Sequence, residues 1–139
     1  MIDIARNFHS LSMLKSVIEM LSVLNMNTLH LHATDDEAWR LQIPSLPELT
    51  DYGGYRCANY PVECLEPQFG SGPFKTSKQN GFLSVSDYTE LLRYAKSNKV
   101  SIIIEINGPG HARAAIKVKG GNIGFQRLPI GVIFGIIWK

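Results

Sequence analysis

The feature that most constrains the fold of this chain is the alternation of two apolar patterns along it. Short apolar or alternating runs, typical of strands, are followed by longer segments whose apolar residues recur every three or four positions, as in amphipathic helices. This alternation favours an α/β fold in which parallel strands are joined by right-handed crossovers. The expected strands are 2–5, 28–32 and 100–106, and the expected helices are 11–24, 85–99 and 112–117.

Local signals indicate where the helices begin and which side they bury. Ser10 or Ser12 is the expected N-cap of the first helix, and Ser84 with Asp87 has the spacing of a capping box for the second. The unbroken β-branched run of the third strand predicts a strand covered on both faces. The residues expected on one face of the second helix are Tyr88, Leu91, Leu92 and Ala95.

Residues 43–81 form a long segment rich in Pro, Gly, Ser and Tyr with no sustained period, which predicts a loop. A loop of this length inside a compact domain is usually either functional or disordered. It contains both cysteines, Cys57 and Cys64, which are too few for a structural zinc site. The sequence leaves open whether they form a local disulfide or remain two separate thiols.

Composition restricts the class of ligand. The chain has 139 residues, 45% hydrophobic and 19% charged, which fits one globular domain. Its net charge is only +2, and no run of Lys or Arg provides a patch for nucleic acid or a membrane surface, so we expect a neutral or small ligand. The apolar segment 130–138 is shorter than the about 20 residues needed to cross a bilayer. The first residues lack the apolar segment of a signal peptide, which leaves the compartment undecided.

Polar side chains follow each expected strand, at the edge where α/β proteins bind ligands. Because the strands are expected to be parallel, these side chains should converge on one site. Taken singly, each also fits a structural role, such as a helix cap, a turn or a hydrogen-bonded core histidine. They are Arg6 and His9, then His32, Asp35 and Asp36, and finally Glu105, Asn107 and His111.

A metal site is the more specific alternative to these structural roles at the end of the second strand. His30 and His32 point to the same face of that strand, and Asp35 follows, which together resemble the ligand set of a metal-dependent hydrolase. Arg6 argues against this, because a permanent cation at the neighbouring strand end would repel a divalent ion. We therefore expect no metal and no other cofactor.

Three motifs occur in a recognisable order: IDIARNFHS, NTLHLHATDDEAWRLQIPSLPELTDYGG and IEINGPGHARAAI. Together they resemble the first three strand-end motifs of the β-N-acetylhexosaminidase catalytic domain, family 20 of the glycoside hydrolases. The resemblance covers about residues 1–117 and implies roughly the first three units of a (β/α)₈ TIM barrel. It also implies hydrolysis of terminal N-acetylglucosamine or N-acetylgalactosamine from glycans or chitin fragments, by enzymes that are commonly lysosomal, secreted or periplasmic.

The resemblance also implies roles for individual residues. Arg6 would bind hydroxyls of the terminal sugar, while Asp35 would hold His111, which would in turn support the general acid of the enzyme. Trp39 and Arg40 would anchor the following loop. Judged by its residue type alone, Trp39 is either a packing residue or a platform for a sugar ring. The remaining candidates for the site are Asp36, Glu37, Trp39 and Asn107.

The chain departs from the family pattern in three respects. It contains no Gly-Gly-Asp-Glu sequence, which in the family carries the catalytic Asp-Glu pair, and it has Asn107 where the family generally has Asp. Residues 118–139 do not read as a continuation of the third unit, so we expect a barrel fragment at 1–117 and an atypical tail at 118–139. We therefore expect the isolated chain to be inactive, with a sugar-binding remnant, a metal-dependent hydrolase or a non-functional fragment as alternatives.

Overall fold

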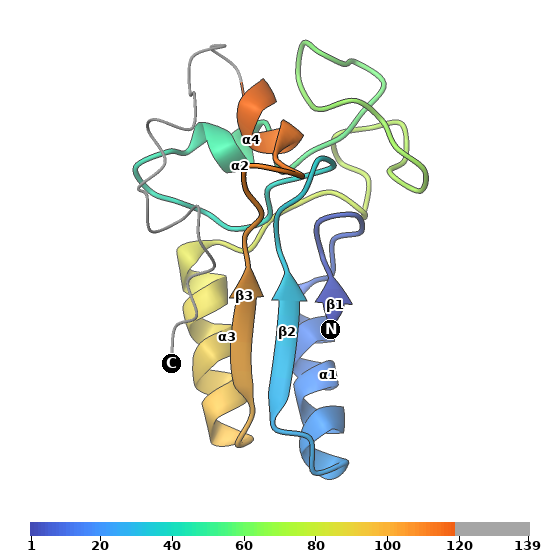
Figure 1. The fold of residues 1–139 in the computed structure, drawn as a ribbon. Helices are drawn as coiled ribbons and strands as arrows, with labels where there is room; N and C mark the ends of the chain where they lie inside the picture. Colours follow the sequence, from blue (N-terminus) through green and yellow to red (C-terminus); the bar gives the residue numbers. More distant parts are fainter. Residues whose placement is uncertain (119–139) are drawn as a thin grey trace.

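In the computed structural model, which describes residues 1–118, a three-stranded parallel sheet carries helices on one face (Figure 1). The strand order follows the chain, β1-β2-β3, and the long loop, α2 and α4 lie beyond the carboxyl ends of the strands. The α/β class with a parallel sheet is thus confirmed. The elements are β1 (Ile2–Asp3), α1 (Leu11–Val23), β2 (Thr28–His32), α2 (Glu48–Asp51), α3 (Val85–Ser97), β3 (Ser101–Glu105) and α4 (Arg113–Lys117).

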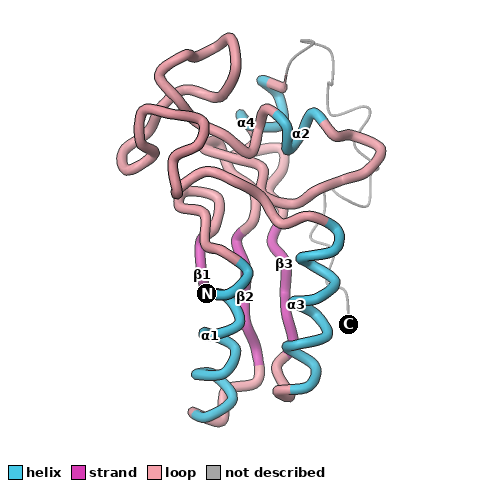
Figure 2. The backbone as a smooth tube through the Cα atoms, turned by 180° about the vertical axis from the view of Figure 1, so that it is seen from behind, coloured by secondary structure: helices cyan, strands magenta, loops and turns pink. Residues whose placement is uncertain are grey.

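The core lies between the sheet and the pair α1 and α3, which cover the same face of it (Figure 2). Alternate residues of each strand point to this face, since successive side chains of a strand lie on opposite sides. Leu31 pairs with Ile104 in the register of β2 and β3, and both side chains are buried. The opposite face of the same strands carries His30, His32 and Glu105, and these polar residues are therefore left for a site.

The two long helices begin where local signals place them. Ser10 is the N-cap of α1, with its hydroxyl accepting from the backbone N–H of Met13, so the choice between Ser10 and Ser12 falls on Ser10. Ser84 and Asp87 form both hydrogen bonds of the capping box of α3. Leu92 was expected on the buried face of α3, but it is 40% exposed, because it follows Leu91 by one position and so lies 100° around the helix.

The outer strands are shorter than the apolar runs predict. Ile4 and Ala5 do not extend β1, because their N–H groups share the carbonyl of His32 and their own carbonyls accept from Arg40. In β3, Val100 and Ile106 lie outside the paired segment. The face of β3 opposite the helices is not fully covered in the described residues, since Ile103 is only partly buried, so the expectation of two covered faces is wrong for them.

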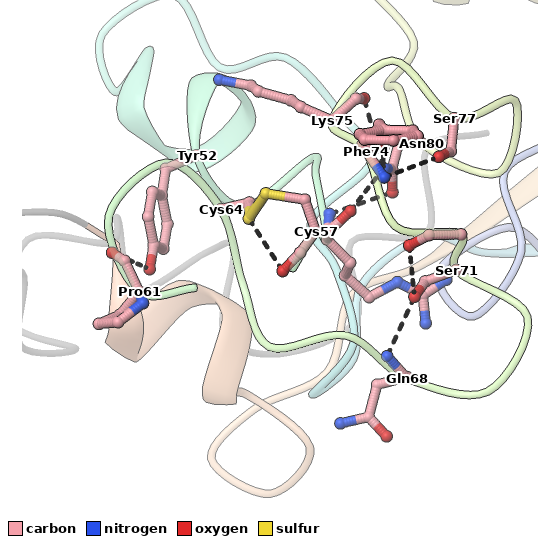
Figure 3. Close-up of a disulfide and its surroundings, with 12 residues drawn as sticks. Tyr52, Cys57, Pro61, Cys64, Gln68, Ser71, Phe74, Lys75, Ser77 and Asn80 are labelled. Carbon is pink, nitrogen blue, oxygen red and sulfur yellow. Dashed lines mark hydrogen bonds between the residues drawn. A yellow bond between two sulfur atoms is a disulfide. The ribbon is translucent and has the colours of Figure 1, made fainter. Parts of the chain in front are cut away.

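The long segment 43–81 is mostly irregular, with α2 as a short helix inside it. The structure joins Cys57 and Cys64 in a disulfide, which resolves the choice between a bond and two thiols (Figure 3). Asn80 closes the same region by accepting from the backbone N–H of Arg56 and donating to its carbonyl. A disulfide and a side-chain clamp thus give order to a segment that lacks regular structure.

Two expectations concern the end of the chain. Among residues 1–118, no helix has the length and apolar character that crossing a membrane requires. The expected tail lies outside the described residues except for Val118, which is buried in a small apolar cluster with Trp39 and Leu49. The expected boundary at residue 117 stays a prediction.

Candidate functional site

A polar cavity of about 540 Å³ opens at the carboxyl ends of the strands. Residues that follow all three strands contribute to it, so side chains distant in sequence meet at the edge where parallel sheets bind ligands. His9, expected at the same edge, is not among the lining residues. The cavity is lined by Met1, Arg6, His32, Asp35, Glu105, Asn107, Gly108, Gly110 and His111.

Arg6 reaches the cavity from the turn after β1, and three carboxylates hold its guanidinium. Nη1 lies 2.8 Å from Asp3, Nη2 lies 2.9 Å from Asp35, and Nε lies 3.1 Å from Glu37. The hydrogen bond to Asp3 is the largest influence on the pKa of Arg6 and, with these neighbouring charges, raises it against the opposing effect of burial. The side chain still exposes 45% of its surface, so a charged donor faces the cavity with its direction fixed.

Asp35 lies at the centre of the site and is 2% exposed. Its Oδ2 lies 2.7 Å from His32 Nε2 and 2.9 Å from Arg6, while its Oδ1 lies 3.2 Å from His111 Nδ1. Burial is the largest influence and by itself would raise the pKa of Asp35. The backbone N–H of Asp36, the contact with His32 and the charges of Arg6 and His111 outweigh burial and lower that pKa below its usual value.

His111 lies on the turn after β3, and its side chain is 63% exposed at the mouth of the cavity. Its backbone adopts a positive φ of 54°, which turns the chain just before α4. Asn107 begins the same turn: its backbone N–H donates to the hydroxyl of Thr34, and its amide nitrogen lies 3.5 Å from Asp35 Oδ2. The structure thus brings the expected residues Arg6, Asp35 and His111 around one cavity, with Asn107 beside them.

The remaining candidates divide between the site and its support. Glu37 contacts Arg6, and Asp36 accepts from the backbone N–H of Arg113 at the start of α4. Trp39 is 2% exposed and donates from its indole nitrogen to the carbonyl of Leu41, which is a packing role and excludes a sugar platform in this conformation.

The alternative metal site was expected to use His30, His32 and Asp35, and these three side chains do not come together at one point. His30 Nε2 lies 2.7 Å from Glu105 Oε2, away from Asp35. In the described residues, the ligand atoms that come within 4.8 Å of one another are those of Asp35, Asp36 and His111. Arg6 pairs with the same Asp35, and its permanent charge opposes a cation there. We assign no metal ligands at this site.

Two buried arginines hold the backbone that carries Arg6. The guanidinium of Arg40, 0% exposed, donates to backbone carbonyls of five residues, including Ile4 and Ala5, which directly precede Arg6. Burial, and then the charge of Arg56, lowers the pKa of Arg40 to about 9, so its guanidinium is charged at neutral pH. Arg56, 1% exposed, donates to the carbonyl of Arg6 itself.

Sequence reasoning identified Arg40 as an anchor but missed Asp3 and Arg56. The position of Asp3, three residues before Arg6, is a signal that could have indicated an ion pair. Arg56 lies in a segment without periodicity, and its contact with Arg6 spans fifty positions, so no local pattern points to it.

Comparisons with known proteins give a consistent result. The family described as "Glycosyl hydrolase family 20, catalytic domain" matches residues 1–124. The chain is 49% identical over 117 residues to N,N'-diacetylchitobiase of Vibrio harveyi, and 47% identical over 116 residues to β-hexosaminidase B of Pseudoalteromonas piscicida. These matches cover 84% and 83% of this chain but only 13% and 15% of the two relatives.

A solved structure agrees with the sequence comparison. The crystal structure of an exo-β-N-acetylglucosaminidase from Vibrio harveyi in complex with N-acetylglucosamine superposes with a TM-score of 0.76 at 40% identity. The superposition covers 84% of this chain and 17% of that enzyme. The chain therefore spans less than a fifth of the length of each of these proteins.

Proposed function

Because the chain belongs to the catalytic-domain family of the family 20 glycosyl hydrolases, we propose that its residues form part of a β-N-acetylhexosaminidase site. The reaction is hydrolysis of terminal N-acetylglucosamine or N-acetylgalactosamine from the non-reducing ends of glycans. The three parallel strands are then the first βα units of a (β/α)₈ barrel, whose active site lies at the carboxyl ends of its strands. The position of the polar cavity agrees with that architecture.

The observation that carries this proposal is the arrangement of Arg6, Asp35 and His111 around one cavity. A neutral sugar offers hydroxyl groups, and a fixed guanidinium supplies charge-assisted hydrogen bonds to them. Asp35 holds Arg6 on one oxygen and His111 on the other, so it sets the geometry of both. In the proposed site, Arg6 binds the terminal sugar while Asp35 orients His111 towards the general acid.

The proposed mechanism retains configuration and is assisted by the substrate, one of the exceptions to the scheme with two enzyme carboxylates. The acetamido oxygen attacks the anomeric carbon of its own sugar while a glutamic acid protonates the leaving oxygen, and an aspartate orients the acetamide. That Asp-Glu pair follows Gly-Gly in the family, and the 139 residues contain no Gly-Gly-Asp-Glu sequence. We therefore propose that this chain alone contributes sugar-binding groups without turnover.

Binding of N-acetylglucosamine to the 139-residue chain, followed by NMR chemical shifts, tests the proposal. We expect shifts at residues lining the cavity, and loss of these shifts in Arg6→Ala. Arg93→Ala, which removes an exposed arginine on α3, is the matched control and should bind as the unaltered chain does. Absence of binding by the unaltered chain, or equal binding by Arg6→Ala, contradicts the sugar-binding role.

Turnover is measured in the same samples with a chromogenic N-acetylglucosaminide. We expect none from the chain alone, because the general acid is not among its residues. Turnover that Arg6→Ala abolishes and Arg93→Ala preserves would show that the chain carries its own acid catalyst, contrary to this part of the proposal. The two measurements thus separate a binding fragment from a complete enzyme.

A further inference from the structure

Both ring nitrogens of His32 face carboxylate oxygens. Nδ1 lies 2.8 Å from Oε1 of Glu105, and Nε2 lies 2.7 Å from Oδ2 of Asp35. The histidine is 5% exposed, so little of its surface is open to water. His32 therefore joins the end of β3 to the loop after β2 through two short polar contacts.

These contacts restrict the protonation of the ring. A neutral imidazole has one N–H donor and one bare nitrogen that only accepts, whereas the imidazolium donates from both nitrogens. A carboxylate is an acceptor, so a bare nitrogen facing Glu105 or Asp35 would set two acceptors against each other. We propose that His32 is a buried imidazolium that bridges Glu105 and Asp35, and that it acts as a positioning residue for Asp35.

The charges around His32 favour this state. Asp35 and Glu105 contact the ring directly, and Asp3, which pairs with His32 in the register of β1 and β2, adds a third carboxylate nearby. Arg6 opposes the charge, since its Nη1 lies 3.3 Å from Nε2 of the ring.

Two further groups affect this balance indirectly. His30, on the same strand, shares Glu105 through the other carboxylate oxygen. Glu37, from the loop after β2, holds Nε of Arg6 and so offsets part of the arginine's charge. Acidic groups therefore outnumber permanent cations around the ring, which stabilises a second proton on it.

The bridge determines which oxygen of Asp35 remains for His111. His32 and Arg6 both contact Oδ2, and His111 Nδ1 contacts Oδ1, which also accepts from the backbone N–H of Asp36. Glu105 in turn holds the imidazolium ring in place from β3. The protonation state is inferred from these contacts together with the charges around the ring, whereas its value for positioning His111 in catalysis rests on the proposed function.

Nitrogen-15 NMR of the imidazole groups in the 139-residue chain at neutral pH tests the inference. The chain has four histidines, and His32→Gln identifies the signals of His32 by removing them. We expect two protonated nitrogens in the unaltered chain. Glu105→Gln keeps an oxygen that can accept from Nδ1 but removes one of the two negative charges that face the ring, so His32 should lose its second proton at a lower pH than in the unaltered chain. The matched control is Glu63→Gln, an exposed glutamate on the long loop, which should leave His32 doubly protonated.

A bare nitrogen on His32 in the unaltered chain, or loss of the second proton at the same pH in Glu105→Gln and in the unaltered chain, overturns the inference. The positioning role has its own readout, because Glu105 lies against His32 whereas His111 contacts Asp35. The ring signals of His111 should shift in Glu105→Gln and stay unchanged in Glu63→Gln. Unshifted His111 signals in Glu105→Gln overturn the positioning role.

The NMR measurement requires neither sugar nor turnover, so its failure is distinguishable from failure of the proposed function. A doubly protonated His32 in a chain that does not bind N-acetylglucosamine contradicts only the proposed function. A singly protonated His32 in a chain that binds the sugar contradicts only this inference.

Discussion

Asp35 shows how one buried carboxylate can hold several cations without being neutralised by burial. Water is nearly excluded from it, which by itself favours the protonated acid. Contacts with His32, Arg6 and His111, together with the N–H of Asp36, reverse that preference and lower the pKa of Asp35. The folded state therefore binds the proton of Asp35 less readily than the unfolded chain does.

This difference predicts how stability depends on pH. With a lowered folded pKa, Asp35 contributes stability that is fully present above its unfolded pKa, near 3.8, and is lost as pH falls through the lower folded value. We expect Asp35→Asn to reduce the free energy of unfolding by about 1 to 3 kcal/mol at neutral pH. Urea unfolding of both chains should show this gap narrowing in acid. A gap that persists unchanged below pH about 3 contradicts this assignment.

Arg40 is the second residue whose environment leads to a definite expectation. Its planar guanidinium donates in fixed directions to carbonyls of three segments that are distant in sequence, and lysine cannot reproduce that fork. Arg40→Lys should reduce the free energy of unfolding by about 3 kcal/mol or more, since several buried carbonyls lose their donors. Denaturant unfolding measures the change. Arg93→Lys on the surface of α3 is the control, and equal stability of both variants would contradict this role.

At the scale of elements, the long helices were predictable because their signals are local. The capping residues Ser10 and Ser84 lie within three positions of the groups they bind. The apolar period identifies most of the buried face but wrongly adds Leu92 to it. Strand ends were less predictable, because tertiary contacts end them. β1 stops at Asp3 since Arg40, distant in sequence, takes the carbonyls that would continue the strand.

The disulfide Cys57–Cys64 is an element-scale feature that sequence alone left open. It closes a short loop beside Arg56, whose side chain reaches the carbonyl of Arg6. In the chain-entropy description, closing a loop of this size stabilises the folded state by about 2 to 3 kcal/mol. We expect the double variant Cys57→Ala/Cys64→Ala to lose about that much in denaturant unfolding.

Reductant provides the matching control for the disulfide. It should lower the stability of the unaltered chain towards that of the double variant and leave the double variant unchanged. Equal stability of the oxidised chain and the double variant would show that the bond contributes nothing to this fold.

For the whole molecule, the site was predictable in outline because parallel strands bring their carboxyl ends to one edge. That rule alone placed Arg6, Asp35 and His111 together. It did not place Asp3 or Arg56. It also gave no means of distinguishing the two neighbouring aspartates: Asp35 pairs with Arg6, whereas Asp36 accepts from the backbone N–H of Arg113. Partner choice depends on where side chains reach in three dimensions, and the order of residues does not specify this.

The proposed function predicts that a relative can supply what the three described strands lack. The chain spans 13% of the Vibrio harveyi chitobiase, to which it is 49% identical over 117 residues. We expect a chimera, in which residues 1–117 replace the matching 117 residues of that relative, to hydrolyse a chromogenic N-acetylglucosaminide. The relative would supply the remaining strands and the acid catalyst, and this chain would supply the cavity around Arg6.

Within that chimera, Arg6→Ala should lower kcat/KM by about 10- to 100-fold, the effect of losing a charged hydrogen bond worth about 1.5 to 3 kcal/mol. Arg93→Ala should leave kcat/KM unchanged, since that side chain lies exposed on α3 and is not among the residues that line the cavity. An inactive chimera that folds cooperatively would show that the present cavity does not serve the family reaction. Equal activity of the Arg6→Ala and Arg93→Ala chimeras would show that the sugar is bound without Arg6.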